Sequence, residues 1–297
     1  MKNELIEKRI SQDSTENQIS TFNRRTWNED SQSCWINSIL QLLLTGFDHS
    51  SNQVEMWSEL GKQLLVSQTE TIIHPQIYKQ ILQNQINLSS QHQERQNILT
   101  GYQGARHFLN IISDLSDNWP DVYNFFLHTT RQSITCLSCQ YESIFDATAH
   151  LYHEMQVPPN GSKLKNFVQH SFENKTNVDD YRCINNCDGS KIKQDKFISS
   201  FSSSHIIIVL SQTENTFNNN VSFTEDFTII DHLDTPLTYE FMAVVQFHEN
   251  MQHYTCDVKS QADGKFYHTN DSRPPKLLNK SEVTKKGFVV LYRKKDG

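Results

Sequence analysis

The sequence lacks the features that mark membrane-spanning and secreted proteins. It has no run of eighteen apolar residues, which excludes a membrane-spanning helix of ordinary length. The stretch from Met1 to Gln18 is polar and charged and has no apolar core, so it resembles neither a secretory signal nor a clear transit peptide. We therefore expect a flexible polar leader over residues 1–20 and a cytoplasmic or nuclear protein.

The chain also lacks a surplus of basic residues and any internal repeat. Its 297 residues include 27 Lys and Arg against 34 Asp and Glu, a net charge of −7. Nucleic-acid binders usually carry a basic stripe, so we expect neither a nucleic-acid partner nor a membrane partner. Mild acidity suits a partner with a basic contact surface, although it is also the ordinary state of a cytosolic protein. The length and the 36% hydrophobic content predict a globular chain of one large domain or two ordinary ones, and we expect a monomer.

Hydrophobic periodicity divides the chain into a helical first half and a strand-rich second half. The predicted helices cover residues 35–44, 54–65, 75–86, 103–115 and 163–172. The predicted strands cover residues 204–210, 240–247, 253–258, 265–269 and 287–292, and the Asn-rich stretch 215–220 indicates a loop. The first of these strands is continuously apolar, which is typical of a strand buried on both faces. Helices followed by strands predict an α+β fold.

Cys34 occupies a position that favours a reactive thiol. Polar residues 28–33 precede it and an apolar helix follows at once, so the thiol lies at the positive end of the helix dipole. That field lowers the pKa of the thiol and favours the nucleophilic thiolate. The alternative is a buried and inert structural cysteine, which is a common residue.

His253 is the candidate base. It begins an aromatic-rich strand, and Asp263-Gly264-Lys265 predicts a hairpin turn after that strand. The following strand ends in Asn270-Asp271, so antiparallel pairing can bring residue 270 beside residue 253. An amide or a carboxylate at that place can orient the imidazole while the other ring nitrogen faces a thiol.

Two residues near His253, His268 and Cys256, are expected to be structural. The chain has 13 histidines, and His248 and His268 are the nearby competitors for the role of base. We place His268 on the opposite pleat face from the neighbours of Asn270. Cys256 lies three residues after His253 on the same strand, so its side chain is expected on the opposite face, packed in the interior.

The six cysteines form two close pairs and two singles. Cys136 and Cys139 enclose two residues, Cys183 and Cys187 enclose three, and 43 residues separate the pairs. Two such pairs are the ligand set of a tetrahedral Cys₄ zinc ribbon, whose ion would contribute folding energy to a subdomain with little core of its own. Without a secretory signal we do not expect disulfides. The alternative is four unrelated thiols.

Two segments of the sequence resemble motifs of the ubiquitin-specific proteases. Ser33-Cys34-Trp35-Ile36-Asn37-Ser38-Ile39-Leu40-Gln41 resembles that family's cysteine box, which reads Thr-Cys-Tyr-Met-Asn-Ser, an apolar residue, Leu and Gln. Residues 239–245, His253-Tyr254-Thr255 and Gly264-Lys265-Phe266-Tyr267-x-x-Asn270-Asp271-Ser272 resemble its histidine box, and residues 287–293 resemble its closing strand. The matches occur in order from about residue 27 to about residue 294, so the resemblance covers nearly the whole chain.

The resemblance implies a papain-like fold with three subdomains. These are a helical thumb over about 21–125, zinc-ribbon fingers with adjoining palm strands over 126–215, and a β-sheet palm over 216–297. It implies a thiol isopeptidase that cleaves after the C-terminal glycine of ubiquitin or a ubiquitin-like modifier. Cys34 would be the nucleophile, His253 the base and Asn270 the third triad member, with Asp271 as a neighbour that can substitute. The modifier would rest on the fingers and thread its tail between thumb and palm, with contacts at Gln103, His107, Phe108, Gln252 and Tyr254.

The sequence departs from the family pattern around the nucleophile and the base. Glu29 stands where the family usually has an oxyanion-stabilising Asn, and a carboxylate would repel a developing oxyanion. Either Asn28, one residue earlier, or backbone N–H groups near Cys34 must then serve. Gln252 replaces the usual glycine before the histidine, and Trp35 replaces the usual tyrosine.

A further departure concerns recognition of the modifier. The family's Gln-Asp-Ala-x-Glu-Phe-Leu box pairs its acids with arginines of the ubiquitin tail, whereas residues 103–109 here read Gln-Gly-Ala-Arg-His-Phe-Leu. Each missing charge-assisted bond costs about 1.5–3 kcal/mol. The substrate is then SUMO or another modifier with a less basic tail, or ubiquitin held differently. Two other readings stay open, a non-catalytic modifier-binding module of this fold and a zinc-ribbon scaffold for other partners.

Overall fold

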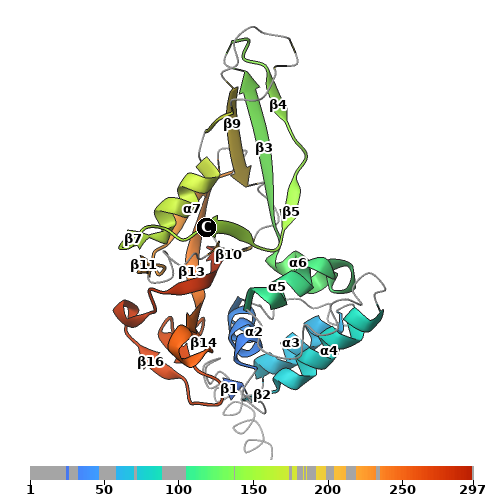
Figure 1. The fold of residues 1–297 in the computed structure, drawn as a ribbon, viewed down its shortest axis with the longest axis vertical. Coiled ribbons are helices and arrows are strands. Elements are labelled where there is room, and N and C mark those ends of the chain that lie inside the picture. The colour runs from blue at the N-terminus through green and yellow to red at the C-terminus, as the bar shows by residue number, and fades with distance from the viewer. Residues whose placement is uncertain are drawn as a thin grey trace, which may run out of the picture. The chain divides into compact units, whose positions relative to one another are not determined.

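The computed structural model describes residues 25–26, 33–46, 58–69, 72–88, 105–136, 138–173, 176–178, 183, 185, 192–198, 204–211, 219–231 and 235–295 (Figure 1). The chain forms two compact units. The first is drawn from Met1–Asp121 and Met242–Thr284, and the second from Val122–Phe241 and Lys285–Gly297. Within the described ranges, no helix is both long and apolar enough to cross a membrane.

The helices of the first unit surround a buried central helix. This helix, α2, spans Cys34–Gly46, and each of its residues is buried because it packs against α3, α5 and strand β14. The other helices are α3 Glu59–Thr69, α4 Pro75–Leu88 and α5 Ala105–Asp114. The four helices predicted here are confirmed, and α4 begins at the proline expected in its first turn. Residues 54–57 and 103–104, at two of the predicted starts, lie outside the described residues.

The strands of the first unit form an antiparallel run in the order β13-β14-β15-β16. Their bounds are β13 Pro236–His248, which begins in the second unit, β14 His253–Lys259, β15 Phe266–Thr269 and β16 Lys276–Leu278. The predicted hairpin between β14 and β15 is confirmed. Gly264 has a φ of +67°, a conformation that glycine adopts freely, and its N–H donates to the Ser260 carbonyl at 2.9 Å.

Short elements complete the first unit. Strands β1 Arg25–Thr26 and β2 Ile72–Ile73 pair in parallel. Three 3-10 turns, η3 Ser116–Asn118, η4 Glu249–Met251 and η5 Lys280–Glu282, connect larger elements. Helix α6, Pro120–Phe126, runs from the first unit into the second and was not predicted.

The second unit holds a five-stranded sheet and a separate set of strands around β10. The five strands are β3 His128–Cys136, β4 Glu142–Ile144, β5 Thr148–His150, β8 Thr176–Val178 and β9 Ile192–Ile198. Strand β10, His205–Ser211, lies between β6 His153–Gln156 and β17 Gly287–Lys294. Residues 205–210 are all buried, which confirms the prediction of a strand covered on both faces. The remaining elements are β7 Ser162–Lys163, α7 Leu164–Glu173, β11 Val221–Ser222 and β12 Phe227–Ile230.

Candidate active site and metal centre

Cys34 is the first residue of α2 and is almost completely buried, with 1% of its surface exposed. The helix begins there because the backbone N–H groups of Ile36 and Asn37 donate to the carbonyl of Ser33, at 3.1 and 3.0 Å. As the first residue of α2, Cys34 lies at the positive end of the helix dipole, which favours a thiolate. The Ser33 hydroxyl also accepts a 2.9 Å hydrogen bond from Nζ of Lys79 on α4.

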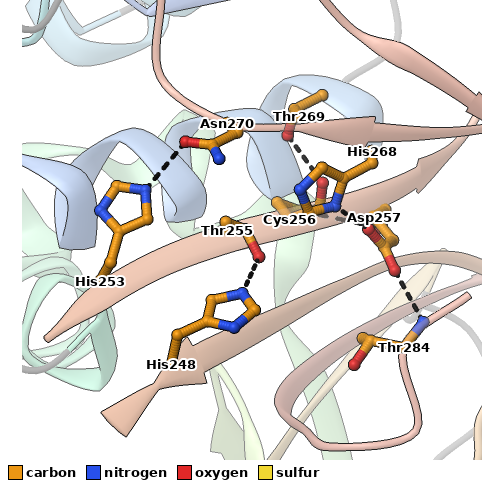
Figure 2. A network of polar contacts seen from close by, with 9 residues as sticks. All are labelled: His248, His253, Thr255, Cys256, Asp257, His268, Thr269, Asn270 and Thr284. Carbon is orange, nitrogen blue, oxygen red and sulfur yellow. Dashed lines mark hydrogen bonds and ion pairs between the residues drawn. The ribbon is translucent and has the colours of Figure 1, made fainter. Parts of the chain in front are cut away.

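The ring of His253 lies between the nucleophile and a polar orienting residue. His253 is the first residue of β14, and its Nε2 lies 2.9 Å from Oδ1 of Asn270 (Figure 2). Because an amide oxygen only accepts, Nε2 carries the proton and Nδ1 is left for the hydrogen bond with the Cys34 side chain. The structure thus brings together Cys34, His253 and Asn270 within the first unit.

The electrostatics of His253 favour its charged form. The hydrogen bond with Cys34 raises the pKa of His253 to about 9, burial opposes that rise, and Asn270 and Asp271 add to it. A cationic imidazole beside a cysteine stabilises the thiolate, and the thiolate in turn keeps the imidazole protonated. This arrangement can deliver a sulfur nucleophile and return a proton to a leaving group.

Asp271 shares the same ring nitrogen at longer range. Its Oδ2 lies 3.6 Å from Nε2 of His253, and its Oδ1 accepts a 2.7 Å hydrogen bond from Nδ2 of Asn37. The backbone of Asp271 has a φ of 46°, a left-handed conformation that Asp tolerates better than most residues. Burial raises the pKa of Asp271, and the Asn37 hydrogen bond counters that rise. Sequence reasoning gave Asn37 no role, although it lies in the cysteine box three residues after the nucleophile.

The competing histidines are engaged by other partners. Nε2 of His248 lies 2.9 Å from Oγ1 of Thr255, and Nδ1 of His268 lies 2.7 Å from Oδ1 of Asp257 (Figure 2). Cys256 has no exposed surface, and burial raises the pKa of its thiol well above the ordinary value. These contacts fit structural roles for all three residues.

The residues assigned to modifier contact differ in their environments. Phe108 is fully buried in the core of the first unit, and Tyr254 is buried with its ring centroid 4.7 Å from that of Phe247. His107 is partly buried, and its ring meets the Trp35 ring edge-on at a centroid distance of 6.5 Å. Gln103, like Asn28 and Glu29 near the nucleophile, lies outside the described residues.

Gln252 stands at the position where the histidine box that this segment resembles has glycine. It is exposed, directly precedes His253 and has φ and ψ of 48°, which is the left-handed conformation. A side chain costs free energy in that conformation, which gives a physical reason for the usual glycine. The side-chain amide of Gln252 donates to the Glu249 carbonyl at 3.0 Å.

Three of the four predicted zinc ligands converge in the second unit. The sulfurs of Cys136, Cys139 and Cys183 lie within 4.8 Å of one another, and that of Cys139 is 3.6 Å from that of Cys183. A tetrahedral ion with Zn–S bonds near 2.3 Å separates its sulfurs by about 3.8 Å. The observed spacing fits that geometry and is much too long for a disulfide. Cys187 lies outside the described residues.

The backbone around these cysteines makes a tight turn and places an N–H group next to a sulfur. The N–H of Gln140 donates to the Cys136 carbonyl at 2.8 Å, and Gln140 has a φ of 59°, so the chain turns tightly behind the first pair. The N–H of Asn185 points to the sulfur of Cys183 at 3.4 Å. An N–H donor to sulfur stabilises a thiolate, which is the form that binds a metal. The three cysteines therefore fit a zinc ion.

Comparison with solved structures identifies the fold. Neither a protein-family model nor a curated protein sequence matches the chain. The chain is similar to a chain of the SAGA DUB (deubiquitinase) module Ubp8/Sgf11/Sus1/Sgf73 bound to monoubiquitin, with 17% identity, coverage of 94% of this chain and 70% of that one, and a TM-score of 0.64. For the same module bound to ubiquitin aldehyde the identity and coverages are equal and the TM-score is 0.65.

A third structure of the Ubp8-Sgf11-Sgf73-Sus1 module matches at 16% identity over 95% of this chain and 69% of that chain, with a TM-score of 0.61. Sequence identity this low carries information about the fold and not about activity. The predicted fold class is confirmed: this chain has the mixed helix-and-sheet architecture of ubiquitin-specific deubiquitinase structures.

Proposed function

We propose that this chain is a thiol isopeptidase that removes ubiquitin or a ubiquitin-like modifier from proteins by cleavage after the modifier's C-terminal glycine. One observation carries the proposal: the ring of His253 hydrogen-bonds both the Cys34 side chain and Oδ1 of Asn270. Nucleophile, base and orienting amide are the three parts that a papain-type reaction needs. The similarity to ubiquitin-bound deubiquitinase structures supports the choice of substrate class.

In the proposed reaction the Cys34 thiolate attacks the carbonyl carbon of the modifier's terminal glycine and forms a carbon–sulfur bond. The tetrahedral oxyanion is held by the Cys34 backbone N–H and by a donor near Asn28. The intermediate collapses with cleavage of the carbon–nitrogen bond, and His253 gives its Nδ1 proton to the leaving lysine amine. Water then attacks the thioester, His253 takes its proton, and the modifier leaves as a carboxylic acid while Cys34 is regenerated.

Asn270 keeps the imidazole in the productive tautomer throughout these steps. Its Oδ1 accepts from Nε2–H, so Nδ1 is the nitrogen that exchanges a proton with sulfur, amine and water. Asp271 adds a negative charge 3.6 Å from the same nitrogen and stabilises the imidazolium. We assign Asn270 as the third triad member and Asp271 as its support.

We propose a structural role for zinc in the second unit. Cys136, Cys139 and Cys183 would hold the ion, with Cys187 as the fourth ligand, and the ion would clip two hairpins together. It supplies folding energy and takes no part in bond cleavage. The sulfur spacing and the N–H donors around these cysteines support the assignment.

We further propose that the modifier has a tail less basic than that of ubiquitin, as in SUMO or another ubiquitin-like protein. The segment that would meet the tail carries Arg106 and His107 and has no acid from residue 103 to residue 109. His107 lies edge-on to Trp35, the residue after the nucleophile, which places the segment that carries Arg106 next to the start of α2. Like charges at close range are unfavourable, which disfavours arginines in the tail.

A panel of activity probes tests both proposals. Each probe is a modifier with a C-terminal electrophile, and the full chain is incubated with each before mass measurement. Covalent labelling of the wild-type chain, and none of Cys34→Ala, is the expected result. Cys34→Ala should keep modifier binding while it loses hydrolysis, and full activity in that variant would refute the assignment. A ubiquitin probe that reacts as fast as any other would refute the specificity proposal alone.

A non-catalytic modifier-binding module of the same fold is the second candidate. The strained conformation of Gln252 beside the base and the acid at Glu29 favour it. It predicts that modifiers bind and that no electrophilic probe labels Cys34. The same panel therefore separates the two functions.

A further inference from the structure

The backbone ladder between β14 and β15 stops short of the triad. The paired residues run from Lys259 opposite Phe266 to Cys256 opposite Thr269. His253 lies three residues before this ladder on β14, and Asn270 directly follows the last residue of β15. Main-chain hydrogen bonds of the described ladder therefore do not fix the amide of Asn270 against the ring of His253.

Side-chain contacts join the two strands at the last two pairs of the ladder, next to the triad. His268 lies directly opposite Asp257, and its Nδ1 is 2.7 Å from Oδ1 of that acid. Next to this pair, the hydroxyl of Thr269 donates to the Cys256 carbonyl at 2.8 Å. Figure 2 shows both contacts between the strand that carries His253 and the strand that leads to Asn270.

The Asp257 carboxylate is buried and fully occupied by these partners. Its side chain is 4% exposed, and Oδ2 accepts a 2.7 Å hydrogen bond from the backbone N–H of Thr284. A buried carboxylate needs such donors, because the charged form loses its hydration. The acid thus ties β14 to β15 through His268 and to the segment before β17 through Thr284.

The geometry points to Asp257 and His268 as positioning residues that fix the register of β14 against β15 and so hold Asn270 in contact with His253. Residues two or four apart on a strand share one face, so His253 shares a face with Asp257 and Asn270 shares one with His268. A slip by one residue would turn Asn270 to the other face of the sheet. The inference rests on the proposed function.

The neighbouring charges on this face do not replace the clamp. His248 on β13 lies opposite His253 and bonds Thr255. Burial, and then the charges of His253 and His268, lower the pKa of His248, which disfavours its charged form. His268 is therefore the basic side chain whose contact with Asp257 joins the two strands.

Alkylation of Cys34 by iodoacetamide, followed by peptide mass across a pH series, tests the inference on the full chain. The variants are Asp257→Ala, which removes the partner of both His268 and the Thr284 N–H, and Asp257→Asn, which keeps one oxygen to accept from the Thr284 N–H and offers an amide N–H to Nδ1 of His268. Glu240→Ala is the matched control, since it deletes another poorly exposed acid, 2.7 Å from Arg293, in the second unit. Each variant is assayed below its unfolding temperature.

We expect the alkylation rate at pH 7 to fall about tenfold in Asp257→Ala, with its pH midpoint moving toward the value near 8.5 of an ordinary thiol. Asp257→Asn should stay within about twofold of wild type, and Glu240→Ala should lose stability without a change in midpoint. A purely structural role for Asp257 would lower the unfolding temperature and leave the midpoint unchanged, which would overturn the inference.

Two further outcomes are distinguishable. If Asp257→Ala does not fold, His268→Gln replaces it, because glutamine keeps a donor but cannot reproduce the ring geometry; an unchanged midpoint in that variant overturns the inference equally. If the wild-type thiol itself titrates as an ordinary cysteine and reacts slowly at pH 7, the proposed function fails. A reactive wild-type thiol that Asp257→Ala does not affect leaves the proposed function standing and rejects the positioning role.

Discussion

The side-chain amide of Asn37 donates a 2.7 Å hydrogen bond to Oδ1 of Asp271, 234 positions along the chain. The bond joins the helix that begins with the nucleophile to the segment that follows β15. Asp271 is the immediate neighbour of Asn270, and Asn37 lies one turn after Cys34. One contact therefore helps to hold the two halves of the triad together.

Removal of this contact should destabilise the protein. Asn37→Ala removes a 2.7 Å donor from the mostly buried carboxylate of Asp271, and we expect the free energy of unfolding to fall by about 1–3 kcal/mol at pH 8. Burial already raises the pKa of Asp271, and loss of Asn37 raises it further. The penalty applies to the charged form, so it is present above the folded pKa and is relieved as the pH falls through it.

Urea unfolding at pH 8 and pH 5 measures this effect. Ser38→Ala on the same helix is the control, since its hydroxyl bonds only main-chain carbonyls at 2.8 and 3.2 Å. Equal losses at both pH values in Asn37→Ala would show that Asp271 is not the group affected.

Asn270 and Asp271 should differ in their importance for turnover. Asn270 lies 2.9 Å from Nε2 of His253, whereas the nearest Asp271 oxygen lies at 3.6 Å. Asn270→Ala should lower kcat by about 100- to 10,000-fold with little change in KM, and Asp271→Ala should lower it less. Hydrolysis of a fluorogenic amide of a reactive modifier gives both constants. A larger loss in Asp271→Ala would reverse the assignment of the third triad member.

The purified chain should contain one zinc ion per molecule. Cys139→Ser should abolish zinc binding and lower the unfolding temperature, because the proposed ion would join Cys139 to Cys183 and supply folding energy. Metal analysis by mass spectrometry and thermal unfolding test this prediction. Cys256→Ala, which removes a buried cysteine of the first unit, should keep its zinc; a full metal complement in Cys139→Ser would refute the site.

Gln252→Gly should stabilise the protein. The left-handed conformation costs a non-glycine residue about 1 kcal/mol, while the greater freedom of glycine in the unfolded chain offsets part of the gain. We expect a net increase of about 0.5 kcal/mol in the free energy of unfolding, measured by denaturant titration. Asn250→Gly in the same loop, at an ordinary backbone angle, should have the opposite sign. Destabilisation of both variants alike would argue against strain at Gln252.

Much of the fold was predictable where buried elements have a clear pattern of apolar residues. Helix α2 has apolar residues at helical spacing, and strand β10 contains a continuous apolar run. The predicted range of each element begins and ends within two residues of its observed bounds. Helix α6 was missed because its seven residues give too few turns for periodicity. Strand β3 was missed because its sequence, His128–Cys136, is mostly polar and lacks alternation.

The candidate site was predictable in its members but not in its connections. Cys34, His253 and Asn270 followed from motif resemblance and from the hairpin. The contact of Asn37 with Asp271 depends on the left-handed backbone at Asp271, which no sequence pattern specifies. The clamp of Asp257 and His268 depends on strand register, which a sequence fixes only through the packed fold.

The pKa of His253 shows whether its ring and the Cys34 thiolate form an ion pair. NMR of ¹⁵N-histidine-labelled protein should give a pKa of about 9 in the wild type and a lower one in Cys34→Ala, nearer the value of about 6.5 for free histidine. Since the folded pKa lies above the unfolded one, protonation of His253 contributes stability that is full below about pH 6.5 and is lost as the pH rises through about 9. The same pKa in both proteins, near 6.5, would contradict the account.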